Sequence, residues 1–381
     1  MLFRLTVTRN KYTISLVDGK SKRKPESTAN RIGFQFKPAS RLNALCDNSI
    51  LNDSPQQARR IMKCIHCGED DVSKFGKDRK GQQRFRCLDC RKAFVAPHAF
   101  AGKKTDLKAG IQALAMLLEG MSVRAAGRLT GLDRDTILGI MVQAGESCRR
   151  FMEAKIVKVP AKVVECDEQW AFVFCKRKTA ERLGKTEECG DRYVFTAIDR
   201  DTKLLLCWHP GVRSQDDTWM FADKLFKSVS GRPTINTDGF TSYTSAIPAT
   251  FHQNCDYAQI VKHFQSGSGQ SAQVRYSPGS ITSVEKKVIC GTVAEAEIGT
   301  SRMERFNLTT RMQVRRFTRL TNAHSKKNRN HDAMLGLYFA WYNWCRHHMT
   351  IKTTPAVQAG LATEKWTLER LLTEAAMTAA K

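Results

Sequence analysis

The stretch VVECDEQWAFVF at residues 163–174 places a carboxylate inside an apolar segment. Its β-branched and aromatic residues predict a strand, and Asp167 lies in the interior of that strand. An aspartate in such a position costs free energy unless something pairs with it. Strand alternation puts Glu165 on the same face as Asp167 and Glu168 on the opposite face. The stretch therefore predicts a core strand whose aspartate has a partner or a function.

The residues that follow predict a mixed α/β sheet. YVFTAIDRDTKLLLCWHPG at 193–211 is typical of a hairpin that turns around Asp199 to Lys203. A helix capped by Ser214 or Asp216 should come next, and then a strand in RPTINTDGF that ends at Asp238. DYAQIVKHF at 256–264 predicts a further strand, followed by a Ser/Gly-rich loop at 266–280 and a poorly defined stretch up to Gly299. A meander that continues as strands alternating with helices favours a mixed sheet.

Three carboxylates in this region suit phosphodiester chemistry with two metal ions. That chemistry needs a few carboxylates from different elements, which hold two Mg²⁺ roughly 4 Å apart. Asp167 on a strand, Asp238 at a strand end and Glu304 on a helix meet the requirement. Each has a simpler explanation as well. Asp238 before Gly239 could open a turn, and Glu304 could complete a capping box begun by Ser301. The joint order on strand, strand and helix favours the metal site.

TSRMERFNLTTRMQVRRFTRL at 300–320 predicts an amphipathic helix that carries Glu304. We expect an apolar stripe on one face and an arginine row on another, made by Met303, Phe306, Val314 and Phe317 and by Arg311, Arg315 and Arg319 respectively. Such a row is often only a solvated face. Beside a metal site it would meet DNA phosphates, and Arg305 would lie close to the catalytic carboxylate.

Two Cys-x2-Cys knuckles stand upstream, CIHC at 64–67 and CLDC at 87–90. Tetrahedral zinc takes four thiolates, and each knuckle offers two from one tight turn. The spacing predicts a structural Zn²⁺ site in a zinc ribbon, with Cys64, Cys67, Cys87 and Cys90 as ligands. Four unrelated buried thiols would not explain two equal spacings.

Helical periodicity runs from 105 to 146, and SVRAAGRLTGLDRDTILGIM breaks it at Thr130 to Leu132. A helix, a Gly-containing turn and a second helix opened by Asp133 are typical of a helix-turn-helix. Its candidate DNA contacts are Arg124, Arg128, Arg134 and Thr136, of which the last two would begin the recognition helix and face the major groove. An ordinary helical hairpin is the alternative.

Composition points to a nucleic-acid partner. The 381 residues include 62 Lys and Arg against 37 Asp and Glu, a net charge of +25 that is spread along the chain. Such a field favours a polyanion. The longest apolar runs fall far below membrane-spanning length, so no membrane partner is expected. Of 13 cysteines only four form a regular pattern, which suits reduced thiols and predicts a cytoplasmic, nucleoid-associated protein.

The sequence predicts a multidomain chain. Residues 1–61, with a basic cluster at Lys20 to Lys24, should be poorly ordered, and we hypothesise that the native protein starts near Met62. The expected domains are a zinc ribbon at 62–100, a helix-turn-helix at 101–150, a catalytic domain at 160–350 and a helical tail at 351–381.

From Met62 onward the chain resembles the DDE transposases of bacterial insertion sequences, most closely the first-described group. The resemblance rests on CIHCG with RFRCLDCRKAF, VECDEQWAFVFCK, YVFTAIDRDTKLLLCW, TINTDGF, RYSPGSITSVEK, SRMERFNLTTRMQVRRFTRLTNAHSKK and TTPAVQAGL. It implies an RNase H-like catalytic domain with Asp167, Asp238 and Glu304 as a triad for Mg²⁺ or Mn²⁺. It also implies cleavage of 3′ ends, strand transfer into target DNA, and a ribbon and helix-turn-helix that bind transposon ends, with at least a homodimer on DNA.

Two other functions remain open on the sequence. One is a zinc-ribbon and helix-turn-helix DNA-binding regulator whose nuclease-like domain is inactive. The other is a structure-selective RNase H-like nuclease that cuts DNA and never joins it.

Overall fold

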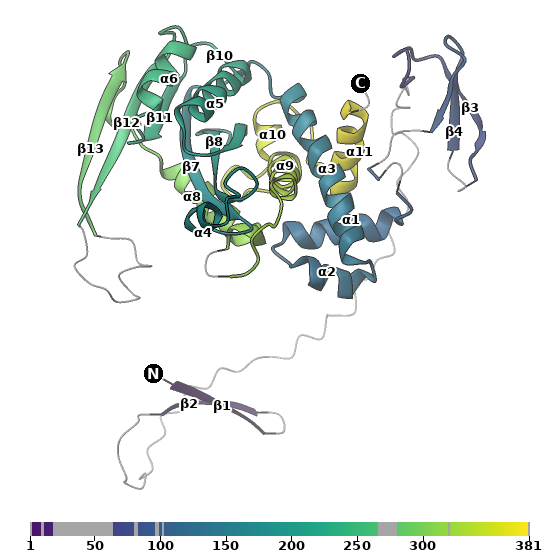
Figure 1. Cartoon of the computed structure of the whole chain (residues 1–381), viewed down its shortest axis with the longest axis horizontal. Helices are drawn as coiled ribbons and strands as arrows, with labels where there is room; N and C mark the ends of the chain where they lie inside the picture. The colour runs from purple at the N-terminus through teal and green to yellow at the C-terminus, as the bar shows by residue number, and fades with distance from the viewer. Residues whose placement is uncertain are drawn as a thin grey trace. The chain divides into compact units, whose positions relative to one another are not determined.

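The chain divides into two compact units, Met1–Ile61 and Met62–Lys381. A computed structural model describes residues 2–8, 11–17, 64–79, 83–95, 99–100, 103–265, 280–318 and 321–379. In the first unit, β1 (Leu2–Thr8) pairs antiparallel with β2 (Lys11–Val17), a hairpin that composition did not predict (Figure 1). The rest of the segment predicted to be poorly ordered, including Lys20 to Lys24, lies outside the described residues.

The first cysteine knuckle precedes a small three-stranded antiparallel sheet, and the second connects its last two strands. Its strands are β3 (Val72–Lys77), β4 (Gln83–Cys87) and β5 (Ala93–Val95). The buried residues of its core are Cys64, Cys87 and Phe94, with Val72, Phe85 and Cys90 packed against them. So little apolar burial is too small to stabilise a fold on its own, and a cross-link or a metal is needed.

Three helices follow, α1 (Leu107–Leu118), α2 (Val123–Thr130) and α3 (Arg134–Lys155). The predicted break between the last two is confirmed. Gly131 ends α2 in the left-handed conformation, with φ of 72°, and Asp133 caps α3 by accepting a hydrogen bond from the backbone N–H of Asp135 at 2.7 Å. Ser122 caps α2 in the same manner. Local turn chemistry therefore sets the geometry of this helix pair.

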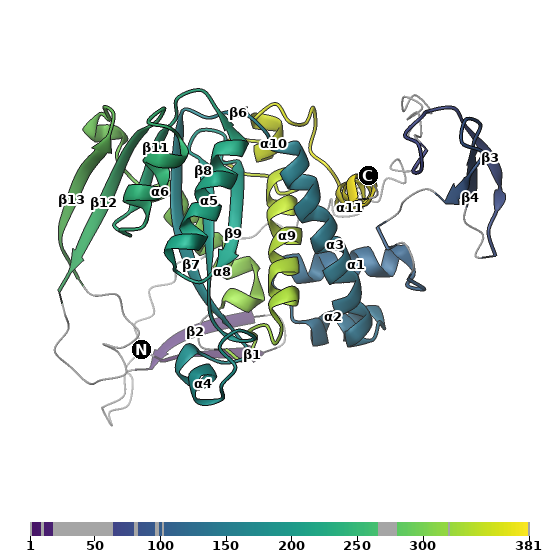
Figure 2. The same ribbon diagram turned by 45° about the horizontal axis from the view of Figure 1, so that its top comes forward.

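The largest element is a six-stranded mixed sheet, as the sequence predicted. Its strands, in the order β13-β12-β11-β7-β8-β9, are Ile281–Cys290, Asp256–Phe264, Thr234–Asp238, Val163–Val173, Gly190–Asp199 and Leu205–Gly211. β7, β8 and β9 form an antiparallel meander, and β11 and β12 continue the sheet parallel to β7 (Figures 1 and 2). The two parallel strands end at the same edge, where ligands commonly bind in α/β sheets.

Helices cover both faces of this sheet. α5 (Gln215–Ser228) and α6 (Tyr243–Thr250) lie on one face, where Phe195 of β8 packs against Phe221 and Tyr243 (Figure 2). α8 (Ser301–Gln313) lies on the other, where Thr196 donates a hydrogen bond to Met303. Adjacent residues of one strand thus contact opposite layers, as strand geometry requires.

The remaining elements are short or lie towards the C-terminus. They are β6 (Val159–Pro160), α4 (Arg177–Arg182), β10 (Val229–Ser230), η2 (Glu295–Glu297), η3 (Arg315–Phe317), α9 (Asn328–Trp344), α10 (Pro355–Gln358) and α11 (Leu368–Ala379). α11 buries Leu371, Leu372 and Ala375 in the main core. Among the described residues, no helix has the length and apolar character needed to cross a membrane.

The prediction of a poorly defined stretch before Gly299 is wrong. Residues Ile281–Cys290 form β13, an edge strand that pairs antiparallel with β12. Its first eight residues are all exposed, whichever face of the strand they lie on, so the strand shows no alternation of buried and exposed positions. The preceding segment at 266–279, predicted as a loop, lies outside the described residues.

α3 and α9 approach each other through two glycines. A Cβ built on Gly145 of α3 would lie 1.9 Å from the carbonyl oxygen of Ala333, and one on Gly336 of α9 would lie 2.5 Å from the carbonyl oxygen of Gly145. Only glycine permits this contact, because the clashing atoms are backbone atoms that cannot rotate away.

Gly145→Ala should therefore lower the free energy of unfolding by about 3 kcal/mol through overpacking. Urea denaturation of the full chain measures the change. The control is Gly139→Ala in the same helix, where the nearest atom to an added Cβ is the Lys103 amine at 3.6 Å, and where stability should be unchanged or slightly raised. Equal stability of the two variants would contradict the close crossing.

Candidate functional site

Asp167 and Asp238 meet where the pairing of two parallel strands ends. β11 pairs with β7 from Thr234 opposite Val163 to Asn236 opposite Glu165, and no pairing follows. The same register, continued by two residues, sets Asp238 opposite Asp167. One oxygen from each of Asp167, Glu168 and Asp238 lies within 4.8 Å of the others. The open end of the ladder thus holds three carboxylates at a spacing that suits a metal ion.

Glu168 belongs to this group although it lies on the other face of β7. Asp167 faces α8, where Asn307 donates to it, whereas Glu168 pairs across the sheet with Phe195 on the face of α6. The predicted alternation is therefore present. Because β7 has no strand partner on this side beyond Glu165, both carboxylates can reach Asp238 in the opening. The sequence alone does not show where the pairing of β11 with β7 ends, so Glu168 was not predicted to belong to the site.

Two amides hold the Asp167 side chain in place. The Asn307 side chain of α8 donates to Asp167 Oδ2 at 2.6 Å, and Gln169 of β7 donates in turn to Asn307. The backbone N–H of Glu168 donates to the other oxygen of Asp167 at 2.8 Å. Asn307 and Gln169 are buried, so this chain of hydrogen bonds fixes the carboxylate against the helix.

Glu165 attaches the start of α8 to the same strand. Its carboxylate is 1% exposed and accepts hydrogen bonds from the backbone N–H groups of Arg302 and Met303 at 2.8 and 2.9 Å. Arg200 forms an ion pair with its other oxygen at 2.9 Å. A carboxylate at a helix N-terminus is favourable because the free N–H groups and the helix dipole both attract it. Glu165 is thus fully engaged in positioning the helix that carries Glu304.

Glu304 lies outside the carboxylate group. Its side chain is half exposed, forms an ion pair with Lys262 of β12, and lies 3.4 Å from the Thr300 hydroxyl. Its charge still reaches Asp167, whose pKa it raises. The capping-box explanation fails, because Ser301 is the first residue of α8 and Thr300 is the cap. The structure therefore places Glu304 near the site but oriented toward β12.

Asp238 has both a turn contact and a site contact. Its Oδ1 accepts the backbone N–H of Phe240 at 3.1 Å, as an aspartate that opens a turn does. Its Oδ2 lies 3.5 Å from Arg213, which also forms an ion pair with Glu168 at 3.2 Å and stacks over the ring of Phe240. Arg213, in the loop between β9 and α5, thus bridges two members of the carboxylate group.

Burial and mutual repulsion shift the titration of the group. Desolvation, reinforced by the charge of Asp238, raises the pKa of Asp167 to about 7. The same two causes raise the pKa of Glu168 to about 8. The Tyr243 hydroxyl opposes that rise, but it makes no hydrogen bond of normal geometry, and Glu168 Oε1 is a buried oxygen without a partner in the described part of the chain. Carboxylates held together in this way favour a cation among them.

The four cysteines of the knuckles come together. Cys64 Sγ lies 3.6 Å from Cys90 Sγ, Cys67 Sγ lies 3.5 Å from Cys87 Sγ, and all four sulfurs fall within 4.8 Å of one another. Tetrahedral thiolates around one metal ion stand about 3.8 Å apart, so the geometry fits. Burial disfavours the Cys64 thiolate, but backbone N–H groups of Cys67 and His66 lower its pKa to about 6. The cluster could therefore hold a metal ion.

The arginines proposed for DNA contact are spread over several elements. Arg124 and Arg128 are exposed on α2, Arg134 begins α3 with half-buried Thr136, and Arg305 is exposed on α8. The predicted row of Arg311, Arg315 and Arg319 on one helix is wrong, because α8 ends at Gln313. The chain turns there to bury Val314 and Phe317. Arg311 is close enough to lower the pKa of Asp167, Arg315 lies in η3, and Arg319 lies outside the described residues.

Comparison with known proteins gives two informative matches. A family model described as a DDE domain matches residues 187–275, a span that includes Asp238. The InsA protein of insertion element iso-IS1N from Shigella dysenteriae is 27% identical over 84 residues, which are 22% of this chain and 91% of that protein. The chain resembles the insertion-sequence DDE transposases. These matches support a transposase function.

A solved structure also aligns with the chain. It is the cryo-EM structure of the piggyBac transposase synaptic complex with hairpin DNA, at 10% identity and a TM-score of 0.33 over 73% of this chain and 72% of that one. Agreement at this level carries no argument about the fold.

The raised carboxyl pKa values predict how the stability of the chain depends on pH. Because Asp167 and Glu168 titrate near 7 and 8 when folded and near 4 when unfolded, the folded state binds more protons between these values. In a chelating buffer the Tm should therefore fall by at least about 4 °C from pH 5 to pH 8. A divalent cation should reverse the fall, because it binds only the folded site.

Scanning calorimetry of the full chain measures this dependence. The double variant Asp167→Asn, Glu168→Gln should show a flatter profile and no response to the cation. A wild-type Tm that is constant over this range, or a double variant with the same slope, would contradict the coupling of these carboxylates.

Proposed function

We propose that the chain is an insertion-sequence transposase that cuts DNA at the ends of its element and joins the freed 3′ ends to target DNA. The observation that carries the proposal is the convergence of Asp167 and Asp238 at the open end of two parallel strands. The match of a DDE domain to residues 187–275 supports it, since that domain includes the second aspartate. The basic balance of the chain, +25, suits double-stranded DNA as the partner.

The catalytic domain is proposed to be RNase H-like and to span residues 160–350. The order of its strands supports this assignment, because an antiparallel meander of three strands is followed by two parallel strands on the other side of β7. The site lies beside the first strand of the meander, at the edge where the parallel strands end. Helices cover both faces of the sheet (Figure 2).

Mg²⁺ or Mn²⁺ is the proposed cofactor, and the donor set fits it. Asp167 and Asp238 would be shared ligands, and carboxylate oxygens are what these cations prefer. When bound, such cations lower the pKa of the attacking water and stabilise the departing 3′ oxygen. Glu304 is proposed as the third ligand, and it would have to leave Lys262 to reach the group. Glu168 is the competing candidate, since its oxygen is already within the group.

The chain's own cations have separate roles in this proposal. Arg213 neutralises Glu168 and Asp238 in the absence of bound ions, and it is free to turn to a DNA phosphate once they bind. Lys262 holds Glu304 away from Asp167 in the same state. Asn307 holds the Asp167 side chain in place, because its amide donates to one oxygen of the carboxylate. No Ser or Tyr nucleophile is required.

The N-terminal part of the second unit is proposed to recognise DNA. Residues 62–100 would form a zinc ribbon and residues 101–150 a helix-turn-helix, and together they would bind the terminal repeats as at least a homodimer. The tight turn at Gly131 and the cap at Asp133 support the helix-turn-helix. Zn²⁺ is the proposed ion of the cysteine cluster, because four thiolates suit it best.

Cleavage assays with carboxylate variants test the catalytic proposal. The purified protein is incubated with DNA that spans both flanks of its gene, with and without Mg²⁺ or Mn²⁺. The wild type should cut at two defined positions and yield strand-transfer product, while Asp238→Asn should lose at least about 100-fold in rate because a shared ligand is gone. Glu304→Gln and Glu168→Gln decide the third ligand, since the variant at the true ligand falls as far as Asp238→Asn.

The outcomes separate the three functions. Binding to the flanks without cleavage under either metal would favour the DNA-binding regulator. Cleavage without any joined product would favour the structure-selective nuclease. Undiminished cleavage by Asp238→Asn would reject the proposed site altogether.

Metal analysis tests the zinc proposal. The protein should carry one zinc ion per chain, and Cys67→Ser should lose it, because three ligands rarely retain a structural ion. Without zinc, residues 64–95 should lose protection against hydrogen exchange while β7 stays protected, since the small core of the ribbon cannot fold alone. The control Cys290→Ser, away from the cluster, should keep its zinc. Zinc retained by Cys67→Ser would contradict the assignment.

A further inference from the structure

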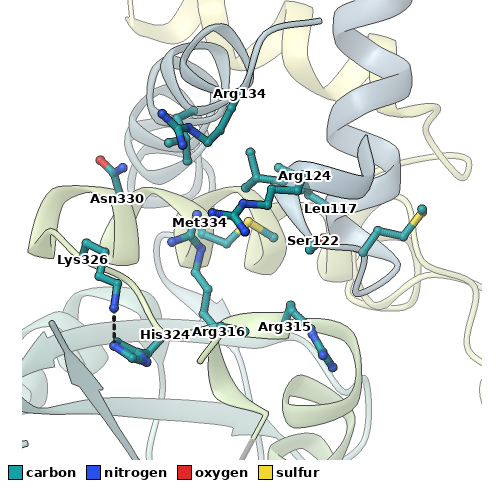
Figure 3. A pocket seen from close by; sticks show the side chains of 14 residues that line it. Leu117, Ser122, Arg124, Arg134, Arg315, Arg316, His324, Lys326, Asn330 and Met334 are labelled. Carbon is teal, nitrogen blue, oxygen red and sulfur yellow. Dashed lines mark hydrogen bonds between the residues drawn. The ribbon is translucent and has the colours of Figure 1, made fainter. Parts of the chain in front are cut away.

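A cationic site lies away from the carboxylates, between the helix pair and the segment after α8. The hollow has a volume of about 250 Å³ (Figure 3). Its cations come from elements far apart in the sequence, Arg124 from α2, Arg134 from the start of α3, Arg315 and Arg316 from η3, and Lys326 from the loop before α9. No aspartate or glutamate is among the described residues that line it.

Three of these arginines have no acidic partner in the described part of the chain. Arg124 and Arg315 are exposed and make no ion pair there. Arg316 is half-buried, and its guanidinium donates only to the Ser325 hydroxyl at 2.8 Å and the Met141 sulfur at 3.3 Å. Burial lowers the pKa of Arg316 to about 10, which reflects the cost of a charge without a counter-charge. Elsewhere Arg200, Arg213 and Arg329 all have carboxylate partners.

Like charges gathered in this way repel each other, and an anion bound among them would offset that repulsion. Arginine is also the residue that binds phosphate through two parallel hydrogen bonds, which gives geometric selectivity for that group. These arginines are more than a solvated surface, because hydrogen bonds to Ser325 and Met141 hold the half-buried Arg316 side chain in the wall of the hollow.

Apolar side chains, among them Met121, Val123, Leu138 and Met334, make up much of the remaining lining. The polar residues Ser122, His324 and Asn330 complete it. The apolar part is unfavourable for a free hydrated anion but suits the deoxyribose that flanks a phosphate in DNA. The combination therefore fits a phosphodiester better than an isolated ion.

We infer that this hollow binds a phosphodiester of DNA, held by Arg124 and Arg315 at the rim and by Arg316 at the wall. The inference rests on the proposed function, since it takes DNA as the partner. It adds a contact that the helix pair and the catalytic domain make jointly. It also changes the expected role of Arg134, because this first residue of α3 lines the same hollow as Arg315 and Arg316 (Figure 3).

A joint site positions the DNA relative to both elements. The arginines of α2 and η3 would share one phosphate group, so the bound DNA would bridge the helix pair and the segment that follows α8. The C-terminal end of α8 is continuous with η3, and its other end is attached to β7 through Glu165. The bound strand would thus be aligned with the helix that carries Glu304.

Fluorescence anisotropy of labelled DNA tests the inference. The full chain is titrated into a duplex and into a single strand of the same sequence, in a buffer without Mg²⁺ or Mn²⁺, so that the carboxylates hold neither cation while the cysteine cluster keeps its proposed zinc. Arg124→Gln and Arg315→Gln should each weaken binding about tenfold, as loss of a charge-assisted contact does. The salt dependence of log K should become shallower by about 0.9 for the duplex or about 0.7 for the single strand.

The double variant tests whether the two arginines share one phosphate. Its loss should be smaller than the product of the two single losses, because the residues then contact the same group. Arg182→Gln is the control, since Arg182 is exposed on α4 and does not line the hollow. The DNA form, duplex or single strand, whose affinity falls more in the variants is the form that occupies the site.

The inference is overturned if both single variants change affinity by less than about twofold, or if Arg182→Gln weakens binding as much as they do. Wild-type protein that binds and cuts DNA while the variants match it would reject this hollow and leave the proposed function intact. Wild-type protein that binds neither DNA form would reject both.

Discussion

The attachment of α8 to β7 is the contact on which the candidate site depends. Glu165 satisfies the first N–H groups of the helix, and Asn307 one turn beyond Glu304 donates to Asp167. Both bonds lie on the same face of one strand, two residues apart. These bonds fix the rotation of the helix about its axis and its position along the strand. They therefore limit the range over which the Glu304 side chain can move. A strand that carried only the catalytic carboxylate would leave the helix without this constraint.

This arrangement also explains why three acidic residues stand so close together in ECDE. Glu165 is neutralised by Arg200 and by the helix N-terminus, so its charge adds little to the repulsion within the site. The compensation at Asp167 and Glu168 is weaker, since Glu168 shares Arg213 with Asp238, and burial raises the pKa of both carboxylates. The two carboxylates that are electrostatically costly are the ones next to Asp238. Proteins retain that kind of cost at functional sites, where a ligand relieves it.

Local sequence patterns predicted most of the fold. The strand in 163–174, the strand that ends at Asp238, a helix cap at Ser214 or Asp216 and the break at Thr130 to Leu132 each depend on residues within a few positions. The structure has β7, β11, a cap at Ser214 and the turn at Gly131. β13 was missed because an edge strand exposed on both faces has no alternation to detect. The arginine row failed for a related reason, since periodicity alone did not show that burial of Val314 and Phe317 would end the helix at Gln313.

Only part of the site could be predicted from the sequence. Asp167 and Asp238 were chosen as ionisable residues at a strand interior and a strand end, and the register of β11 on β7 brings them opposite each other. Glu168, Arg213, Lys262 and Asn307 contact the site through tertiary pairing, which no local pattern encodes. Lys262 comes from β12, two residues beyond the partner of Asp238, and Arg213 comes from the loop after β9. Both cations reach the site because parallel strands place their ends at one edge. That edge is therefore where charge of either sign accumulates, and the balance between the two determines which carboxylates are free to bind a cation.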